Sequence, residues 1–202
     1  MSKPAAKPPM ADFFSTHEEA LTVIAEGGLV LLAAADSPDA PLYLFSAARD
    51  ITADAVNFLA ANARGLICLA IGAGDAGRLE IPLMVTNASN ARCASFGRSI
   101  EAASGVATGI SAADRALTMR AAAAPECAPT DLVSPGHVFP IIVGMNDRSP
   151  AAAALALVSR SGRGSAASFC QVLREDGNAA QLDDLPRLWW ADGVPMLAAT
   201  SV

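Results

Sequence analysis

The densest group of polar residues in the chain is the segment Thr108-Gly-Ile-Ser-Ala-Ala-Asp-Arg115. A glycine turn that leads into a helix capped by Ser111 and Asp114 leaves backbone N–H groups for an anion, and Arg115 adds positive charge. These residues and Arg120 form a candidate substrate- or phosphate-binding set. The same pattern is also typical of an ordinary helix start, and both interpretations stay open.

A second candidate is His137, which lies in Pro135-Gly-His-Val-Phe-Pro140 and is one of only two histidines. Prolines on both sides fix the loop, and a rigid loop can present a histidine as an acid or base at neutral pH. The alternative is a turn whose histidine bonds the backbone. The other histidine, His17, lies in the capping turn of the first expected helix, where we expect it to be solvated.

Other kinds of site have little support in the sequence. Two histidines far apart and scattered carboxylates do not make a metal-ligand set. No Gly-x-Ser-x-Gly elbow supports a Ser–His–Asp triad. The turn Gly72-Ala-Gly74 lacks the third glycine of a dinucleotide fingerprint.

The segments that position these candidates alternate between strand and helix patterns. Capping pairs predict a helix that begins near Ser15 or Thr16 and one that runs over 111–124, and Ser149 followed by Pro150 predicts a third. A further helix is expected over 52–63 and a short one over 183–190, with strands over 29–34, 42–46, 66–71, 138–143, 167–173 and 194–199. Segment 72–105 reads as irregular, with short elements near 83–85 and 94–96. One α/β or α+β domain over 13–202 follows, after a disordered leader at 1–12.

Composition narrows the class of protein. Hydrophobic residues make up 52% and charged residues 17% of 202 residues, which argues against disorder. The apolar stretch Leu29 to Ala35 is far short of the roughly 20 residues of a membrane span. A net charge of −6 without a basic stripe argues against nucleic acid. We therefore expect a protein that binds neither membrane nor nucleic acid.

The spacing and surroundings of the cysteines indicate in which cellular compartment the protein works. They are too widely spaced for a zinc knuckle or a CxxC pair: Cys68, Cys93, Cys127 and Cys170. Three of them lie in or beside apolar stretches, where a free thiol behaves as a small hydrophobe. The leader has no apolar run behind its two lysines, unlike a signal peptide. We expect reduced thiols and a cytoplasmic protein.

Several segments together resemble the 3,4-dihydroxy-2-butanone-4-phosphate synthase family, which converts ribulose 5-phosphate to 3,4-dihydroxy-2-butanone 4-phosphate and formate in riboflavin biosynthesis. They are Gly65-Leu-Ile-Cys-Leu69, Leu79-Glu-Ile-Pro-Leu-Met-Val85, the segment from Thr108 to Arg115 with Thr118 and Arg120, and Pro135 to Pro140. Their order and spacing agree with the family from about Ser15 to the C-terminus. The resemblance implies a mixed sheet flanked by helices, an α+β fold of three α/β/α-like layers.

The resemblance also implies a homodimer whose two active sites lie across the subunit interface. In the family, the residues matching Thr108 and His137 reach into the neighbour's site. With Cys68, they form the catalytic remnant of that site in this chain.

The chain departs from the family in its acidic and metal-binding positions. The family's acidic loop, Asp-x-x-x-Arg-Glu-Asn-Glu-Gly-Asp, is replaced by a proline-containing segment in which only Asp39 matches a magnesium-binding glutamate. The metal-binding histidine of the family's Gly-His-Thr-Glu-Ala corresponds to Pro150, and the late catalytic glutamate corresponds to Gln171. We therefore expect no cofactor, with magnesium only if the family reaction survives.

These differences predict a divergent synthase homologue that is inactive alone and acts as a binding or partner subunit. It would form a homodimer, or a heterodimer with an authentic synthase to which it lends Thr108 and His137. Two alternatives stay open: a repurposed lyase or isomerase on a related sugar phosphate, and an active synthase whose metal site is rebuilt from Asp39 and Asp36. Of the paired Trp189 and Trp190, one is expected at an interface.

Overall fold

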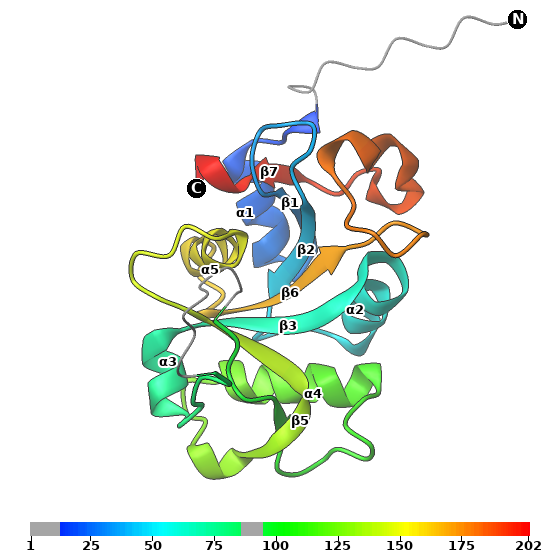
Figure 1. Ribbon diagram of the computed structural model, residues 1–202. Coiled ribbons are helices and arrows are strands. Elements are labelled where there is room, and N and C mark those ends of the chain that lie inside the picture. Colours follow the sequence, from blue (N-terminus) through cyan, green and yellow to red (C-terminus); the bar gives the residue numbers. More distant parts are fainter. Residues whose placement is uncertain (1–12, 86–94) are drawn as a thin grey trace, which may run out of the picture.

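The structure is a computed structural model that describes residues 13–85 and 95–202 (Figure 1). The expected leader at 1–12 and the first residue of the expected short element at 94–96 lie outside the described residues. Within these ranges, no helix is both long and apolar enough to cross a membrane.

Seven strands form one mixed sheet. In chain order they are β1 (Val30–Ala33), β2 (Leu42–Ala47), β3 (Arg64–Gly72), β4 (Ile100–Ala102), β5 (Leu132–Val143), β6 (Ala166–Val172) and β7 (Met196–Ala198). Their spatial order is β4-β5-β3-β6-β2-β1-β7. The central strand β3 runs parallel to β5 and antiparallel to β6, and β2 is antiparallel to both β6 and β1. This architecture confirms the mixed sheet flanked by helices that the resemblance implied.

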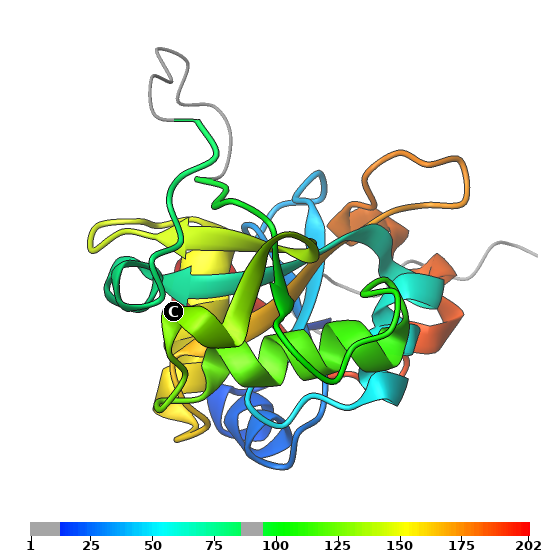
Figure 2. The same ribbon diagram turned by 90° about the horizontal axis from the view of Figure 1, so that it is seen from below.

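Helices cover both faces of the sheet. One face packs against α1 (His17–Ala25) and α5 (Pro150–Arg160). The other packs against α2 (Ala53–Phe58), its π-helical continuation (Leu59–Ala63) and α4 (Ala112–Ala123). Figure 2 shows α4 lying across β4 and β5. Because adjacent strand residues point to opposite faces, one strand supplies both cores.

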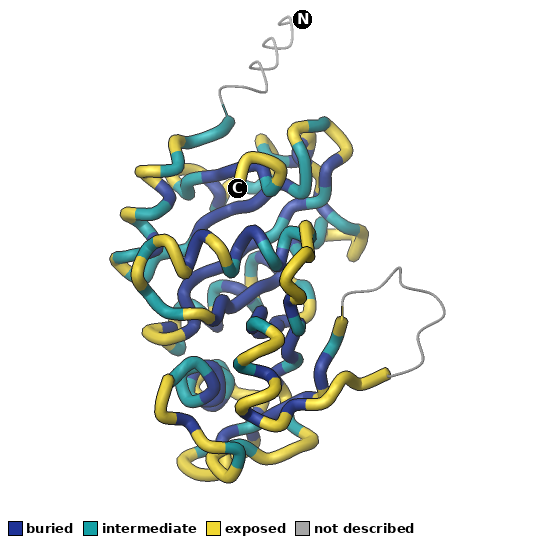
Figure 3. Tube along the Cα trace, turned by 90° about the vertical axis from the view of Figure 1, so that its left-hand side faces the viewer, coloured by how far each residue is buried: buried dark blue, intermediate teal, exposed yellow. Residues whose placement is uncertain are grey.

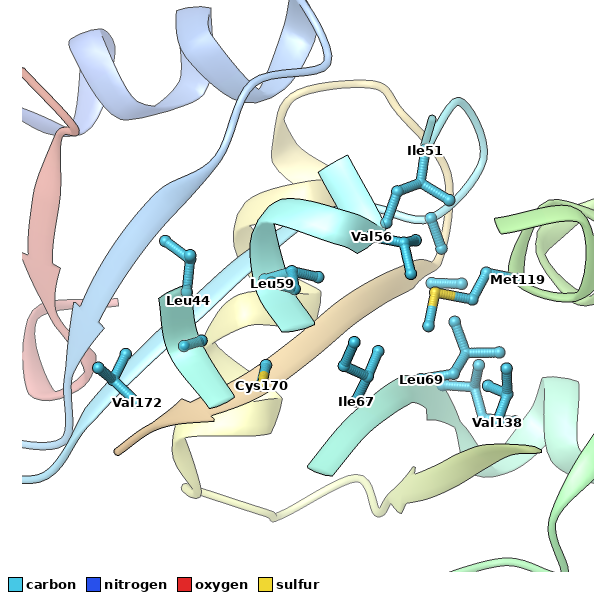
Figure 4. Packing of buried hydrophobic residues seen from close by; sticks show 14 of the residues in the cluster. Leu44, Ile51, Val56, Leu59, Ile67, Leu69, Met119, Val138, Cys170 and Val172 are labelled. Atoms are coloured by element: carbon cyan, nitrogen blue, oxygen red, sulfur yellow. The ribbon is translucent and has the colours of Figure 1, made fainter. Parts of the chain in front are cut away.

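The core on the α2 and α4 side is drawn in Figure 4. Val56 and Leu59 from the α2 side and Met119 from α4 pack onto strand residues such as Ile67 and Leu69. Four of these side chains are fully buried and Ile67 nearly so. Each buried aliphatic side chain of this size contributes about 1.5–3 kcal/mol. Figure 3 shows the resulting contrast between buried strands and exposed connecting segments.

The helix starts are set by local capping chemistry. Thr16 and Glu19 form the capping box of α1, and the Ser111 hydroxyl accepts the N–H of Asp114 at the start of α4 (3.0 Å). Ser149 caps α5, with Pro150 at its first position. These starts agree with the sequence predictions because each cap depends on residues within one helical turn.

Three parts of the fold differ from expectation. The helix expected over 52–63 changes to π-helix after Phe58 and ends at Arg64, whose φ is 65°, so β3 begins before Gly65. The segment expected to be irregular contains α3 (Ala73–Arg78) and β4. Strand β5 begins at Leu132, earlier than expected, because it pairs with β4 along a stretch whose proline and glycine are typical of a loop.

Candidate functional site

A cavity of about 750 Å³ lies where the sheet meets the start of α5. Its wall includes Cys68 from β3, Gln171 from β6 and Pro150 from α5. The fold therefore brings together three positions that the family resemblance had singled out. We call this space the α5 cavity.

Three aromatic side chains line the α5 cavity. Tyr43 and Phe169 stack with ring centroids 4.9 Å apart and an interplanar angle of 21°, and Phe96 also lines the space. Tyr43 pairs with Gln171 across β2 and β6, while Phe169 pairs with Cys68 across β6 and β3. Burial raises the pKa of the Tyr43 hydroxyl, so it is neutral near pH 7.

The Cys68 thiol is a poor nucleophile in this setting. Its residue is only 4% exposed, and burial, with a smaller contribution from Cys170, raises the pKa of the Cys68 thiol to about 12. Its sulfur lies 3.5 Å from the carbonyl oxygen of Leu66. The thiolate is the reactive form of cysteine, and at pH 7 it is present only in trace amounts.

Gly65 allows β3 and β6 to approach each other beside the cavity. A Cβ atom at this position would collide with the carbonyl oxygen of Gln171. The pairing of β3 with β6 is irregular between Arg64 and Ile67, next to the same contact. Glycine is thus required by backbone packing at this edge of the cavity.

The start of α5 offers little to an anion. Pro150 has no N–H, and the N–H of Ala152 is bonded to the Ser149 hydroxyl (3.3 Å). The N–H of Ser149 is bonded to the carboxylate of Asp147 (2.7 Å), which also lines the cavity. Asp147 is the only charged residue in the described lining, and its charge is negative.

The described residues do not fit a magnesium site. Magnesium prefers a near-octahedral set of oxygen ligands. Asp39 is exposed in the turn between β1 and β2 and does not line the α5 cavity, while Pro150 has no donor atom in its side chain. Among residues 13–85 and 95–202, no group of three or more His, Cys, Asp or Glu side chains is placed to hold a metal ion.

A second group of polar residues lies at the β4 edge of the sheet. His137 Nδ1 lies 2.8 Å from Glu101 Oε2, and the two side chains are 44% and 14% exposed. Gly109, next to Thr108, has φ 78°, and a Cβ atom there would collide with the Glu101 carboxylate. We call Glu101, Thr108 and His137 the edge cluster. None of its three residues lines the α5 cavity.

Sequence reasoning did not find Glu101. It lies on the three-residue strand β4, between buried Ile100 and Ala102, within the segment expected to be irregular. An isolated charge between two apolar residues is the only local signal of such a position. Its pairing with His137, 36 positions along the chain, is not local and could not be read from the sequence.

The turn before α4 is already filled by a side chain of the protein. The Asp114 carboxylate accepts the N–H groups of Ala107, Thr108 and Gly109 at 3.3, 3.2 and 3.0 Å. Burial alone would raise the pKa of the Asp114 carboxyl, but hydrogen bonds from this turn and Ser111 hold it below its ordinary value. Three N–H groups of this turn are therefore bonded to Asp114 and are not available to an anion.

The two arginines of the candidate anion set differ in their surroundings. Arg120 Nη1 donates to the carbonyl oxygen of Ile51 at 2.6 Å and so ties α4 to the segment before α2. The guanidinium of Arg115 is partly buried, its Nε has no hydrogen-bond partner among the described residues, and burial lowers its pKa. Its charge is felt by Cys170 on β6. Of the candidate set, Ser111 and Asp114 thus lie together at the start of α4, while Arg120 is held at Ile51.

The paired tryptophans face in different directions. Trp190 packs edge-on against Phe58, with ring centroids 5.7 Å apart, whereas Trp189 is 83% exposed. One ring therefore belongs to the packing around α2 and the other is at the surface, as the sequence suggested. Trp189 at an interface stays a prediction.

The fold is a mixed sheet between two helical layers, with a cavity at the start of α5. Solved structures of 3,4-dihydroxy-2-butanone 4-phosphate synthases have the same fold. The synthase of Candida albicans has a TM-score of 0.85 and 28% identity, covering 93% of this chain and 95% of that one. The two-domain synthase RibBX of A. baumannii has a TM-score of 0.84 and 31% identity, over 92% and 56% of the two chains. A further synthase structure, in complex with two magnesium ions, is 24% identical and shows the fold alone.

Sequence comparison identifies the family. The family model of 3,4-dihydroxy-2-butanone 4-phosphate synthase matches residues 18–202. The synthase of Neisseria meningitidis serogroup A is 36% identical over 171 residues, which cover 83% of this chain and 47% of that protein. The synthase of Desulfovibrio desulfuricans is 33% identical over 193 residues, covering 92% and 86%. The chain belongs to the 3,4-dihydroxy-2-butanone 4-phosphate synthase family, and it spans about half the length of relatives such as the Neisseria protein.

Proposed function

We propose that this chain is a divergent member of its family that does not carry out the synthase reaction alone and acts as a binding or partner subunit. The observation that carries the proposal is the chemistry of the α5 cavity. Cys68 is held as a neutral thiol, Gln171 cannot take a proton, and Pro150 cannot bind a metal. The proposal also keeps the cytoplasmic location expected from the sequence.

The size of the expected defect follows from the reaction. Conversion of ribulose 5-phosphate to 3,4-dihydroxy-2-butanone 4-phosphate and formate requires proton transfers beside a carbonyl and stabilisation of the resulting negative oxygen. One positioned acid or base contributes roughly 10²–10⁴ in rate, and such losses do not simply add. A cavity whose only described ionised group is Asp147 supplies few of these functions.

The partner role is supported by the edge cluster. Its histidine is half exposed and hydrogen-bonded to Glu101, and it contributes nothing to the wall of its own α5 cavity. Val133, the strand partner of Glu101, places an apolar side chain beside this pair and is 48% exposed. A polar group beside exposed apolar surface is typical of a subunit interface. We therefore propose a dimer, with a second copy or with an authentic synthase.

The alternatives have weaker support. A repurposed lyase or isomerase on a sugar phosphate would need an anion site, and the turn before α4 is occupied by Asp114. An active synthase with a rebuilt metal site would need Asp36 and Asp39 at the cavity, and neither lines it.

The decisive experiment is formate release from ribulose 5-phosphate with magnesium, using the full purified chain. An authentic synthase assayed in parallel provides the positive control. We expect no formate above background. Turnover at a rate typical of ordinary enzymes, roughly 1 s⁻¹ or more, would contradict the proposal and favour a synthase with replaced catalytic groups.

A further inference from the structure

We propose that the α5 cavity binds an uncharged planar molecule, aromatic or heteroaromatic, in place of a sugar phosphate. This inference rests on the proposed function, because it names the ligand class of a cavity that has lost its metal and acid–base groups.

Charge disfavours a phosphate in this cavity. Asp147 is the only charged residue in the described lining, and it lies at the start of α5. At that helix start Pro150 lacks an N–H and Ser149 occupies the N–H of Ala152, so fewer N–H groups are left for an anion. A dianionic ligand would therefore meet a like charge and no described cationic partner.

The walls suit a flat apolar molecule. Tyr43 and Phe169 form a stacked pair, and Phe96 adds a third ring. Aliphatic side chains, including Leu66 and Ile141, also line the cavity. The volume of about 750 Å³ lies within the roughly 300–1,000 Å³ typical of small-molecule pockets. Aromatic walls bind planar rings by stacking or edge-to-face contact.

A few neutral polar groups remain to orient the ligand. Gln171 offers a donor and an acceptor, and the neutral Tyr43 hydroxyl offers both as well. The two residues are cross-strand partners on β6 and β2, so their side chains leave the same face of the sheet. Uncharged donors and acceptors in an apolar wall favour a ligand with matching neutral groups, such as a ring nitrogen, a carbonyl or a hydroxyl.

The test is a fluorescence titration of the full chain with the neutral aromatic dye N-phenyl-1-naphthylamine. We expect saturable binding that indole reverses and that neither inorganic phosphate nor ribulose 5-phosphate reverses. The variant Leu66→Asp, which places a carboxylate in the wall, should weaken dye binding at least about tenfold. Its matched control is Ile110→Asp, which alters a residue of equal exposure outside the cavity and should keep dye affinity within about twofold.

A second variant guards against misfolding. Gln171→Glu is close to isosteric, and its carboxylate should weaken dye binding at pH 8 and restore it as the pH falls and the group is neutralised. Circular dichroism melts verify that each variant is folded. Displacement of the dye by ribulose 5-phosphate, absence of dye binding, or equal loss in Leu66→Asp and Ile110→Asp would each overturn the inference.

The formate assay distinguishes failure of the proposed function from failure of the proposed ligand class. Formate release would contradict the proposed function, whether or not the dye binds. A chain that releases no formate but binds ribulose 5-phosphate in place of the dye would leave the proposed function standing and refute the ligand class.

Discussion

The α5 cavity and the edge cluster belong to the same sheet but carry different chemistry. The cavity is walled by rings, aliphatic side chains and neutral polar groups, and its one described charge is Asp147. The edge cluster holds a histidine–carboxylate pair 2.8 Å apart, and the histidine is half exposed. The histidine–carboxylate pair therefore lies at the edge of the sheet, while the described charge of the cavity is a single carboxylate.

This contrast indicates that the two regions are suited to different kinds of contact. Binding of a small molecule in this chain would depend on the cavity wall, whereas the subunit contact that we propose would depend on the sheet edge. His137 and Glu101 lie outside the cavity of their own chain and would not contact a molecule bound there. The contrast is therefore the physical basis for proposing a partner role.

The largest expected effect concerns a mixed dimer. We expect this chain, co-expressed with an authentic synthase from the same cell and purified through two different tags, to form a mixed dimer that releases formate. His137→Ala in this chain should lower the formate rate of that dimer by about 10² or more, because it removes a positioned acid or base from the partner's site. The measurement is formate release per mixed dimer.

The control for this prediction is Cys68→Ala in the same chain. Cys68 faces the α5 cavity, so the rate of the mixed dimer should stay within about twofold. Equal losses of formate rate in the two variants would show that the two regions do not differ in what they contribute to the partner's site. Recovery of separate homodimers alone would sink the heterodimer version of the proposal.

A smaller effect is expected from the turn that carries Thr108. Asp114→Ala leaves the N–H groups of Ala107, Thr108 and Gly109 without their acceptor and should lower Tm by roughly 5–10 °C. Asp114→Asn keeps one acceptor oxygen and should lose about half as much. Thermal melts followed by circular dichroism measure both, and equal Tm values for wild type and Asp114→Ala would show that the turn does not depend on the carboxylate.

The same carboxylate gives a pH dependence. The folded-state pKa of Asp114 is held below its ordinary value of 3.8, so its stabilisation is fully present above that value and is lost as the pH falls through the folded pKa. The difference in Tm between wild type and Asp114→Asn should be constant near neutral pH and shrink below about pH 4. A gap that widens in acid would contradict the assigned sign.

How much the sequence could predict depended on the range of each interaction. The caps at Thr16, Ser111 and Ser149 were predictable because donor and acceptor lie within one turn. Strand β4 was not, because three residues carry too little pattern and its pairing with β5 is remote. Glu101 was missed for the same reason.

The candidate site shows the same limit. The convergence of Cys68, Pro150 and Gln171 was expected from family resemblance, since no spacing rule joins residues from three separate elements. The residue types around Ser111 indicate a candidate anion site, because they do not determine whether a capping aspartate turns outward or back into its own loop. In the structure, Asp114 turns back.

The smallest expected effect is chemical and concerns Cys68. With its pKa raised to about 12, the Cys68 thiolate fraction at pH 8 is on the order of 10⁻⁴, so iodoacetamide should label only a few per cent of native Cys68 in an hour. In guanidinium chloride the thiol should return to ordinary reactivity and label fully. Peptide mapping by mass spectrometry reports Cys68 separately from the other cysteines. Rapid labelling of the native chain would reveal a reactive thiol in the α5 cavity. That result would favour a repurposed enzyme over a binding subunit.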